Sequence, residues 1–221
     1  MNKNFKKSTI ILLSVSILAS SIPVFAQPKN TKALTEINDC VNFKEENYNS
    51  SLANSILEKN FDEDLLTDEE SKLLDSLVSK ETKSTEEKEE ILEVLKTFKD
   101  PYLRSVKKVI SVDKAGKALN IVIDLALLAT GEGGLANAGI KKLEKKYGVE
   151  KAKEIIEKKV ITKVVKKLSD WGLKGMLAHA GRFAGIIIDN IFDPGTAIAK
   201  FIDNHLDANK GNGYLDVNVP W

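Results

Sequence analysis

The sequence predicts an all-α fold, a multi-helix bundle with a flexible N-terminal leader and a short extended C-terminal tail. Apolar residues recur every three or four positions over most of the 221 residues, which is the period of a helix with one buried face. Helix-start signals repeat along the chain, and the alternation typical of a strand is confined to the last residues. With 43% hydrophobic and 29% charged residues, the composition excludes a wholly disordered chain, a collagen and a polytopic membrane protein.

The N-terminus has the pattern of a secretory signal. Three lysines within the first seven residues precede an apolar run from Thr9 to Ile22, and Pro23 then breaks the helix before the small residues that end at Ala26. The run is about 14 residues, shorter than the roughly 20 that span a bilayer. We therefore expect residues 1–26 to be a signal peptide cleaved after Ala26, and the protein to be secreted; a membrane anchor is the alternative.

The charges are segregated along the chain. Residues 27–100 carry 10 basic and 19 acidic side chains, a net charge of −9. Residues 101–182 carry 18 basic and 8 acidic side chains, a net charge of +10, while residues 183–221 are at −3 and residues 1–26 at +3. The overall value of +1 therefore conceals an asymmetry that points to charged partners or to contact between the two parts.

The acidic part predicts a leader followed by helices. Residues 27–50 contain Pro28 and little periodicity, which predicts a flexible leader, and an acidic helical region follows over 51–100. Within it, Thr67-Asp68-Glu69-Glu70 and Ser84-Thr85-Glu86-Glu87 are capping boxes. In each, the hydroxyl accepts from the amide three residues on and the glutamate reaches back, so helices are expected to start at both places.

Residues 101–221 predict a basic and apolar helical domain with a strand-like tail. Asp100-Pro101 has the pattern of an N-cap and first helical residue, which predicts a helix through Ile110. The most apolar stretch then runs from Ala118 to Thr130 and ends in a glycine-rich turn. A lysine-rich helix follows and stops at Gly148.

The next helix is the clearest in the sequence, because apolar residues step by three or four over about 20 positions. These residues are Val149, Ala152, Ile156, Val160, Val164, Leu168 and Trp171. Further on, Ile186-Ile187-Ile188 favours a helix over a strand, and Asp193-Pro194-Gly195 marks another helix start. Alternating residues from Tyr214 onward predict a short strand.

Motifs for catalysis are weak, so we expect a protein that is not an enzyme and has no cofactor. Gly131 to Ala136 loosely matches a dinucleotide fingerprint, but that site needs a strand before it, and an inter-helix turn is the favoured interpretation. His179 and His205 lie outside any metalloprotease motif, and no nucleophile elbow is present in the sequence. Cys40 stands alone in a polar context that does not activate a thiol.

A segment near the C-terminus has the oxygen-rich pattern of a calcium loop, with Asp207, Asn209 and Asp216 as candidate ligands. Its glycine falls at position seven rather than six, and no glutamate stands at position twelve. An Asn/Gly turn that joins a helix to a strand is therefore the favoured interpretation, and no metal is predicted.

The stretch from Ile121 to Leu135, followed by the lysine-rich helix and Trp171, resembles the circular bacteriocins. The likeness covers residues 118–171 and rests on apolar, glycine and lysine composition. It implies a compact, saposin-like bundle of short helices with a basic patch that permeabilises target membranes. The signal and the tail beyond residue 172 depart from that family's pattern.

These observations predict an exported, membrane-active helical protein that contacts anionic membranes or envelope surfaces through the lysine-rich block of about residues 101–188. The acidic 27–100 region is expected to fold against this block and mask it. No nucleic-acid partner is predicted. The alternative is a soluble secreted interaction module that binds a protein or a cell-wall polymer. The residues expected to contact the membrane or partner are Lys151, Lys158, Lys159, Lys163, Lys166, Lys167 and Trp171.

Overall fold

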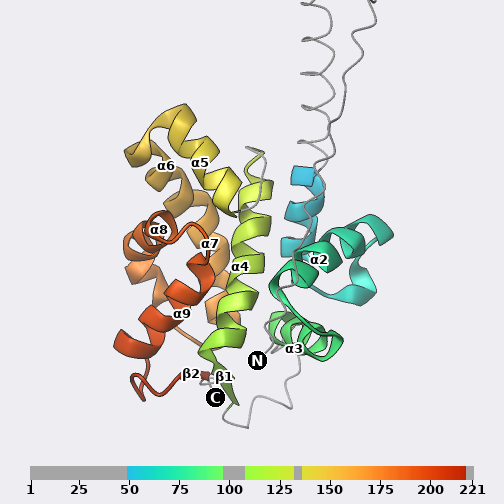
Figure 1. Cartoon of the computed structure of the whole chain (residues 1–221), viewed down its shortest axis with the longest axis vertical. Coiled ribbons are helices and arrows are strands. Elements are labelled where there is room, and N and C mark those ends of the chain that lie inside the picture. Colours follow the sequence, from blue (N-terminus) through green and yellow to red (C-terminus); the bar gives the residue numbers. More distant parts are fainter. Residues whose placement is uncertain (1–48, 97–107, 132–135, 218–221) are drawn as a thin grey trace, which may run out of the picture.

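The computed structural model describes residues 49–96, 108–131 and 136–217 (Figure 1). These residues are mostly helical with one two-stranded sheet, which confirms the all-α fold class. Residues 49–58 form the first helical segment. The other elements are η1 (Glu63–Leu65), α2 (Asp68–Glu81), α3 (Thr85–Lys96), β1 (Lys108–Ser111), α4 (Val112–Ala129), α5 (Ala136–Tyr147), α6 (Val149–Ile155), η3 (Ile156–Val160), α7 (Ile161–Asp170), η4 (Met176–His179), α8 (Ala180–Asp189), α9 (Pro194–His205) and β2 (Tyr214–Val217).

Helix α4 is the centre of the molecule. Every residue from Ala118 to Leu128 is buried, because α2 and α3 cover one side of α4 while α5, α7 and α9 cover the other (Figure 1). A helix that is apolar on all sides is typical of the core of a bundle. Among the described residues, no helix combines the length and the apolar character needed to cross a bilayer.

Helices α4 and α9 touch backbone to backbone. A Cβ atom on Gly195 would overlap the carbonyl oxygen of Gly116 and the amide of Asn120, and a Cβ atom on Gly116 would overlap Thr196. The Gly195 amide donates to Asn120 Oδ1 at 2.6 Å, and Asp193 caps α9 as the sequence predicts, by accepting from the Thr196 amide. The two glycines therefore set how closely the helices approach.

The two predicted capping boxes start α2 and α3. Thr67 Oγ1 accepts from the Glu70 amide at 3.4 Å, and Glu70 Oε2 accepts from the Thr67 amide at 2.7 Å. At the second start, Ser84 Oγ accepts from the Glu87 amide at 3.1 Å. The Glu87 carboxylate accepts from the amide of Lys83, one residue earlier than the standard box.

One predicted helix is wrong at its end, and a second boundary shifts by two residues. The helix expected to run through Ile110 is replaced at Lys108–Ser111 by strand β1, which pairs antiparallel with β2 so that Ile110 faces Leu215. Both of these side chains are buried, while the Ser111 hydroxyl accepts from the Lys114 amide and so starts α4 at Val112. The leader was predicted to extend to residue 50, whereas residues 49 and 50 are already helical. Residues 1–48 and 97–107, with the predicted signal and cleavage site, lie outside the described residues.

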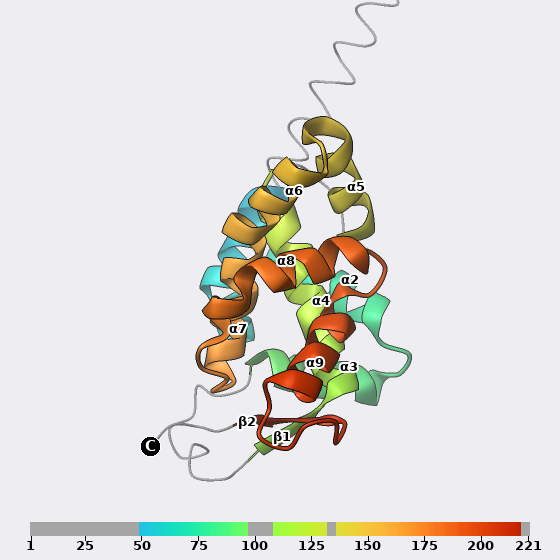
Figure 2. The ribbon, with the colours of Figure 1, turned by 90° about the vertical axis from the view of Figure 1, so that its left-hand side faces the viewer.

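The long helix predicted around residues 149–171 is confirmed as the continuous run of α6, η3 and α7. Its middle segment, Ile156–Val160, is a π-helical turn, and the run lies between Gly148 and Gly172, which have φ angles of 80° and 84°. The predicted apolar face is buried from Ala152 onward, while Val149 at the start is exposed. Helix α8 confirms that the isoleucine run is helical, and it lies beside α9 in Figure 2.

Candidate functional site

The most strongly charged part of the structure is the basic arm, which we define as α5, α6, η3 and α7 (residues 136–170). It carries eleven lysines and five acidic residues. Ten of the lysines are exposed or half-exposed, and Lys167 is buried. Figure 1 shows α5 and α6 at the end of the molecule opposite the strands β1 and β2.

Two of the predicted contact residues, Lys151 and Lys158, share one carboxylate. Their ammonium groups lie 2.6 and 2.7 Å from the oxygens of Glu154. Hydrogen bonds from these two lysines lower the pKa of Glu154 to about 2, and the pKa of Lys158 is raised in return. Because all three side chains reach solvent, this network contributes little to stability and leaves one net positive charge at the surface.

Three further predicted residues, Lys159, Lys163 and Lys166, form a row along the arm. Their spacing of four and three residues places them on the same side of the helix. Lys159 and Lys166 are exposed and Lys163 is half-exposed, and none of the three makes an ion pair with the described residues. The row is therefore a set of positive charges that the described fold does not neutralise.

Lys167 and Trp171 correct the prediction, because they are 2% and 0% exposed and cannot contact a surface. Lys167 Nζ donates to the carbonyl oxygen of Leu95 and lies 4.9 Å from the centroid of the Phe61 ring. Trp171 Nε1 donates to the carbonyl oxygen of Val94 at 3.0 Å. Both side chains reach the last turn of α3, where helix carbonyls lack partners and attract a cation.

These contacts show which lysines the acidic region covers. The end of α3 covers Lys167, whereas Glu87 and Glu90 pair at 2.5 and 2.9 Å with Lys117 and Lys114 of α4. Within the arm, Lys167 is therefore covered by α3, while eight of the other lysines are exposed.

The calcium candidates lie close together: Asp207 and Asn209 are in the loop after α9, and Asp216 is in β2. Asp207 accepts from the amides of Ala208 and Asp216 at 2.6 and 2.7 Å, and Asn209 Nδ2 donates to the Asp216 carboxylate. Asp203, in the last turns of α9, accepts from the amides of Asn212 and Gly213 in the same loop. Within the described ranges, no group of three or more His, Cys, Asp or Glu side chains is arranged to hold a metal ion. The arrangement matches the favoured turn, in which the carboxylates stabilise the backbone.

Asn120 and Asp124 are polar residues whose structural role the sequence analysis missed. Asn120 Nδ2 donates to Glu81 at 3.0 Å and to Asp193 at 2.9 Å. Asp124 accepts from the Ala136 amide at 2.5 Å, at the start of α5. Burial raises the pKa of Asp124, and burial together with the nearby carboxylates of Asp124 and Asp193 raises the pKa of Glu81. The sequence did carry a signal for this role: two polar residues interrupt an otherwise apolar helix, and buried polar groups require hydrogen-bond partners on neighbouring elements.

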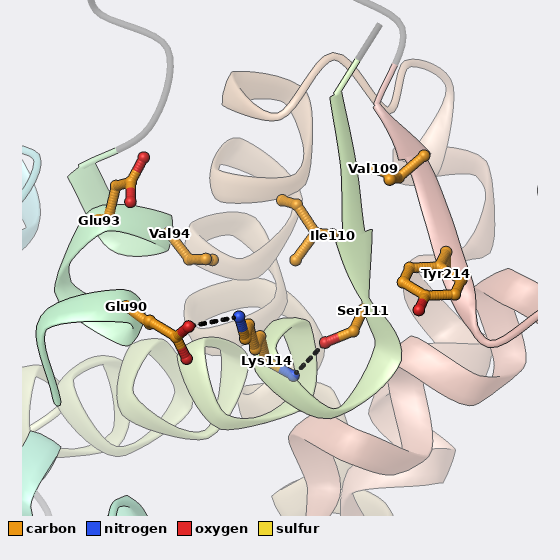
Figure 3. Close-up of a pocket in the computed structure, with 8 residues that line it drawn as sticks. All are labelled: Glu90, Glu93, Val94, Val109, Ile110, Ser111, Lys114 and Tyr214. Atoms are coloured by element: carbon orange, nitrogen blue, oxygen red, sulfur yellow. Dashed lines mark hydrogen bonds and ion pairs between the residues drawn. The ribbon is translucent and has the colours of Figure 1, made fainter. Parts of the chain in front are cut away.

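A cavity of about 570 Å³ lies between α3 and β1, and it belongs to neither predicted site (Figure 3). Ile110 points toward α3, while Val109 points away from it, and Glu90 pairs with Lys114 at 2.9 Å. The lining residues are Glu90, Glu93, Val94, Val109, Ile110, Ser111, Lys114 and Tyr214. The cavity thus combines carboxylates, an apolar surface and the margin of a strand.

The chain matches no family model, no curated protein and no solved structure. Its function is therefore inferred from the geometry of its own surfaces. On the basic arm, Tyr147 and Val149 are 39% and 54% exposed at the turn between α5 and α6, and Lys146 Nζ lies 4.8 Å from the centroid of the Tyr147 ring. Lysines beside exposed aromatic and aliphatic groups are typical of proteins that bind at a membrane interface.

Proposed function

We propose that the protein binds anionic membrane surfaces through the basic arm. The observation that supports this most is the row of Lys159, Lys163 and Lys166, which makes no ion pair with the described residues and reaches solvent. A lysine near an anionic bilayer contributes about 1 kcal/mol of binding free energy. Three such residues together with their exposed neighbours are enough for a salt-dependent surface interaction.

The turn between α5 and α6 adds an apolar contribution to this proposal. Tyr147 and Val149 would enter the head-group region while the lysines around them contact lipid phosphates. The signal peptide that the sequence predicts supports the proposal, since it would direct the protein out of the cell, where it would meet such membranes. The resemblance to circular bacteriocins supports permeabilisation of the target membrane as the consequence of binding.

The test is co-sedimentation of the protein without its first 26 residues with vesicles of phosphatidylglycerol and phosphatidylcholine. We expect binding that falls with salt and is lost on phosphatidylcholine alone. The triple variant Lys159→Gln, Lys163→Gln, Lys166→Gln should bind about 100-fold more weakly, since it loses three charges worth about 1 kcal/mol each.

The matched control carries the same loss of charge elsewhere, with Lys72→Gln, Lys83→Gln and Lys210→Gln at three exposed positions outside the arm. It should bind within about twofold of the unaltered protein, because those charges lie away from the proposed surface. Equal weakening by both triple variants would contradict a role for the arm. Binding to neutral vesicles as strong as to anionic ones would contradict the electrostatic basis.

A further inference from the structure

Phe192 is the most exposed large apolar side chain among the described residues, at 79%. It lies in the turn between α8 and α9, which reaches the side of α5 (Figure 2). Single exposed apolar residues are ordinary on protein surfaces, so the surroundings of Phe192 decide what its exposure means. Those surroundings are a fixed backbone and a lysine of α5.

The turn is fixed on both sides of Phe192. Before it, the Asn190 amide donates to the carbonyl oxygen of Ile186 at 3.0 Å, at the end of α8. After it, the Asp193 amide donates to the carbonyl oxygen of Asn190 at 3.1 Å, and the Asp193 carboxylate accepts from Asn120 Nδ2 at 2.9 Å. The ring is therefore held in solvent by an ordered turn, and binding through it does not have to order a flexible loop.

A lysine of α5 lies against the exposed ring. Lys141 Nζ is 5.4 Å from the centroid of the Phe192 ring, within the range of a cation–π contact. Lys145, one helical turn further on the same side of α5, is exposed and makes no ion pair with the described residues. Of the two carboxylates that flank the turn, Asp193 is bonded within the fold and Asp189 is exposed. Helix α5 carries four lysines against one glutamate, so its positive charge exceeds that of the two aspartates.

An ammonium group beside an aromatic ring matches the layering of an anionic bilayer. In such a bilayer the phosphates lie above the acyl chains, so the ring of Phe192 would reach the chains while Lys141 stays at the phosphates. A protein partner fits less well, because a stable protein interface buries about 800 Å² on each partner. One exposed aromatic ring supplies at most about 200 Å² of that area.

We propose that Phe192 enters the acyl region of the anionic membrane that the basic arm binds, and so adds an apolar anchor from outside the arm. This inference rests on the proposed function, since the arm has to bring the protein to the bilayer. Lys141 and Tyr147 are six residues apart, about 9 Å along α5. With Phe192 beside Lys141 and Tyr147 at the C-terminal end, α5 is held along the bilayer surface at two points.

The test compares Phe192→Ala with Tyr214→Ala by co-sedimentation with vesicles of phosphatidylglycerol and phosphatidylcholine. Tyr214 is 48% exposed in β2, so its removal is a matched loss of an exposed aromatic ring at the end of the molecule opposite α5 (Figure 1). We expect Phe192→Ala to bind about tenfold more weakly than the unaltered protein, and Tyr214→Ala to bind within about twofold of it. Because the lost contact is apolar, the tenfold ratio should persist as salt is raised, whereas the loss in the lysine triple variant should shrink.

A second measurement uses the fluorescence of Phe192→Trp. On vesicles whose phosphatidylglycerol is brominated in its acyl chains, this variant should be quenched more than the unaltered protein, whose Trp171 is 0% exposed. Equal vesicle affinities of Phe192→Ala and the unaltered protein, or no added quenching in Phe192→Trp, would overturn this inference and leave the function of the arm standing. An unaltered protein that does not bind anionic vesicles would overturn both. A protein that is dimeric by light scattering and becomes monomeric with Phe192→Ala, with unchanged vesicle binding, would replace the inference with self-association through this turn.

Discussion

The acidic helices at residues 49–96 and the basic arm are regions of opposite charge that use their charges in opposite ways. In the acidic helices, carboxylates maintain the fold. Glu70 is 3% exposed and accepts from Lys59 and from the Thr67 amide, and Asn120 of α4 donates to Glu81. The residues of this kind are Glu70, Glu81 and Glu87, whereas Glu63, Asp75 and Glu90 make ion pairs that reach solvent.

In the basic arm, the lysines mostly reach solvent. Lys151 and Lys158 share Glu154, the row at Lys159 has no ion pair with the described residues, and Lys167 alone is buried and bonded to α3. The net charge of +1 thus conceals two regions: acidic helices in which several carboxylates are bonded within the fold, and a basic arm whose lysines are available to a partner. Removing a buried carboxylate from the acidic helices should therefore change stability, whereas removing a carboxylate from the basic arm should change binding.

The junction between the two regions is where a substitution should have its largest effect. Trp171→Ala empties a fully buried site and removes the hydrogen bond to Val94, and we expect it to lower the free energy of unfolding by about 3–5 kcal/mol. Urea denaturation followed by circular dichroism measures this. Trp171→Phe, which keeps most of the apolar volume, should cost clearly less, and equal losses for the two variants would show that the volume at this junction does not matter.

Helix α9 packs on the side of α4 opposite the acidic helices, and a substitution at Gly195 tests how close this contact is. Gly195→Ala places a methyl group against the backbone of Gly116 and should lower the free energy of unfolding by about 3 kcal/mol. Gly185→Ala in α8 is the control, since a Cβ there meets no atom within 4 Å, and it should be neutral or slightly stabilising. A thermal melt in which both variants match the unaltered protein would show that α4 and α9 are farther apart than described.

The fold-maintaining role of the acidic helices is tested by pH. The pKa of Glu70 is lowered to about 2, against the burial of its carboxyl group, by hydrogen bonds from Lys59, Ser55 and Thr67. A carboxylate with a depressed pKa stabilises the fold above its ordinary value of 4.5, and this stabilisation is lost as the pH falls toward about 2. Glu70→Gln keeps a residue suited to the capping box and should cost about 2 kcal/mol at pH 7 and almost nothing at pH 2. A cost that does not change with pH would contradict this assignment.

The matching substitution in the basic arm should leave stability unchanged. Glu154→Gln removes an exposed carboxylate from between Lys151 and Lys158, so the melting temperature should not change measurably. Binding to anionic vesicles should strengthen about fivefold, because the arm gains one net positive charge. A fall in melting temperature without stronger binding would remove the distinction between the two regions.

Patterns along the chain predicted the helices whose signals are local. The Thr67 hydroxyl caps the helix that follows it, and the periodic residues from Ala152 to Leu168 lie on one face of a single helical run. Both signals are local, so the sequence is sufficient to recognise them. Strand β1 was missed because its partner β2 lies about a hundred residues away, and only that pairing stabilises four extended residues. Lys167 was assigned to the surface because lysines usually face water, and its burial depends on carbonyls at the end of α3.

The most direct test of the membrane proposal is amide hydrogen exchange of the protein without its first 26 residues, with and without phosphatidylglycerol vesicles. The account predicts added protection at the turn between α5 and α6 and along residues 158–166, with none in α2 and α3. Added protection confined to α2 and α3, or spread evenly over both regions, would contradict the claim that the basic arm is the surface that binds.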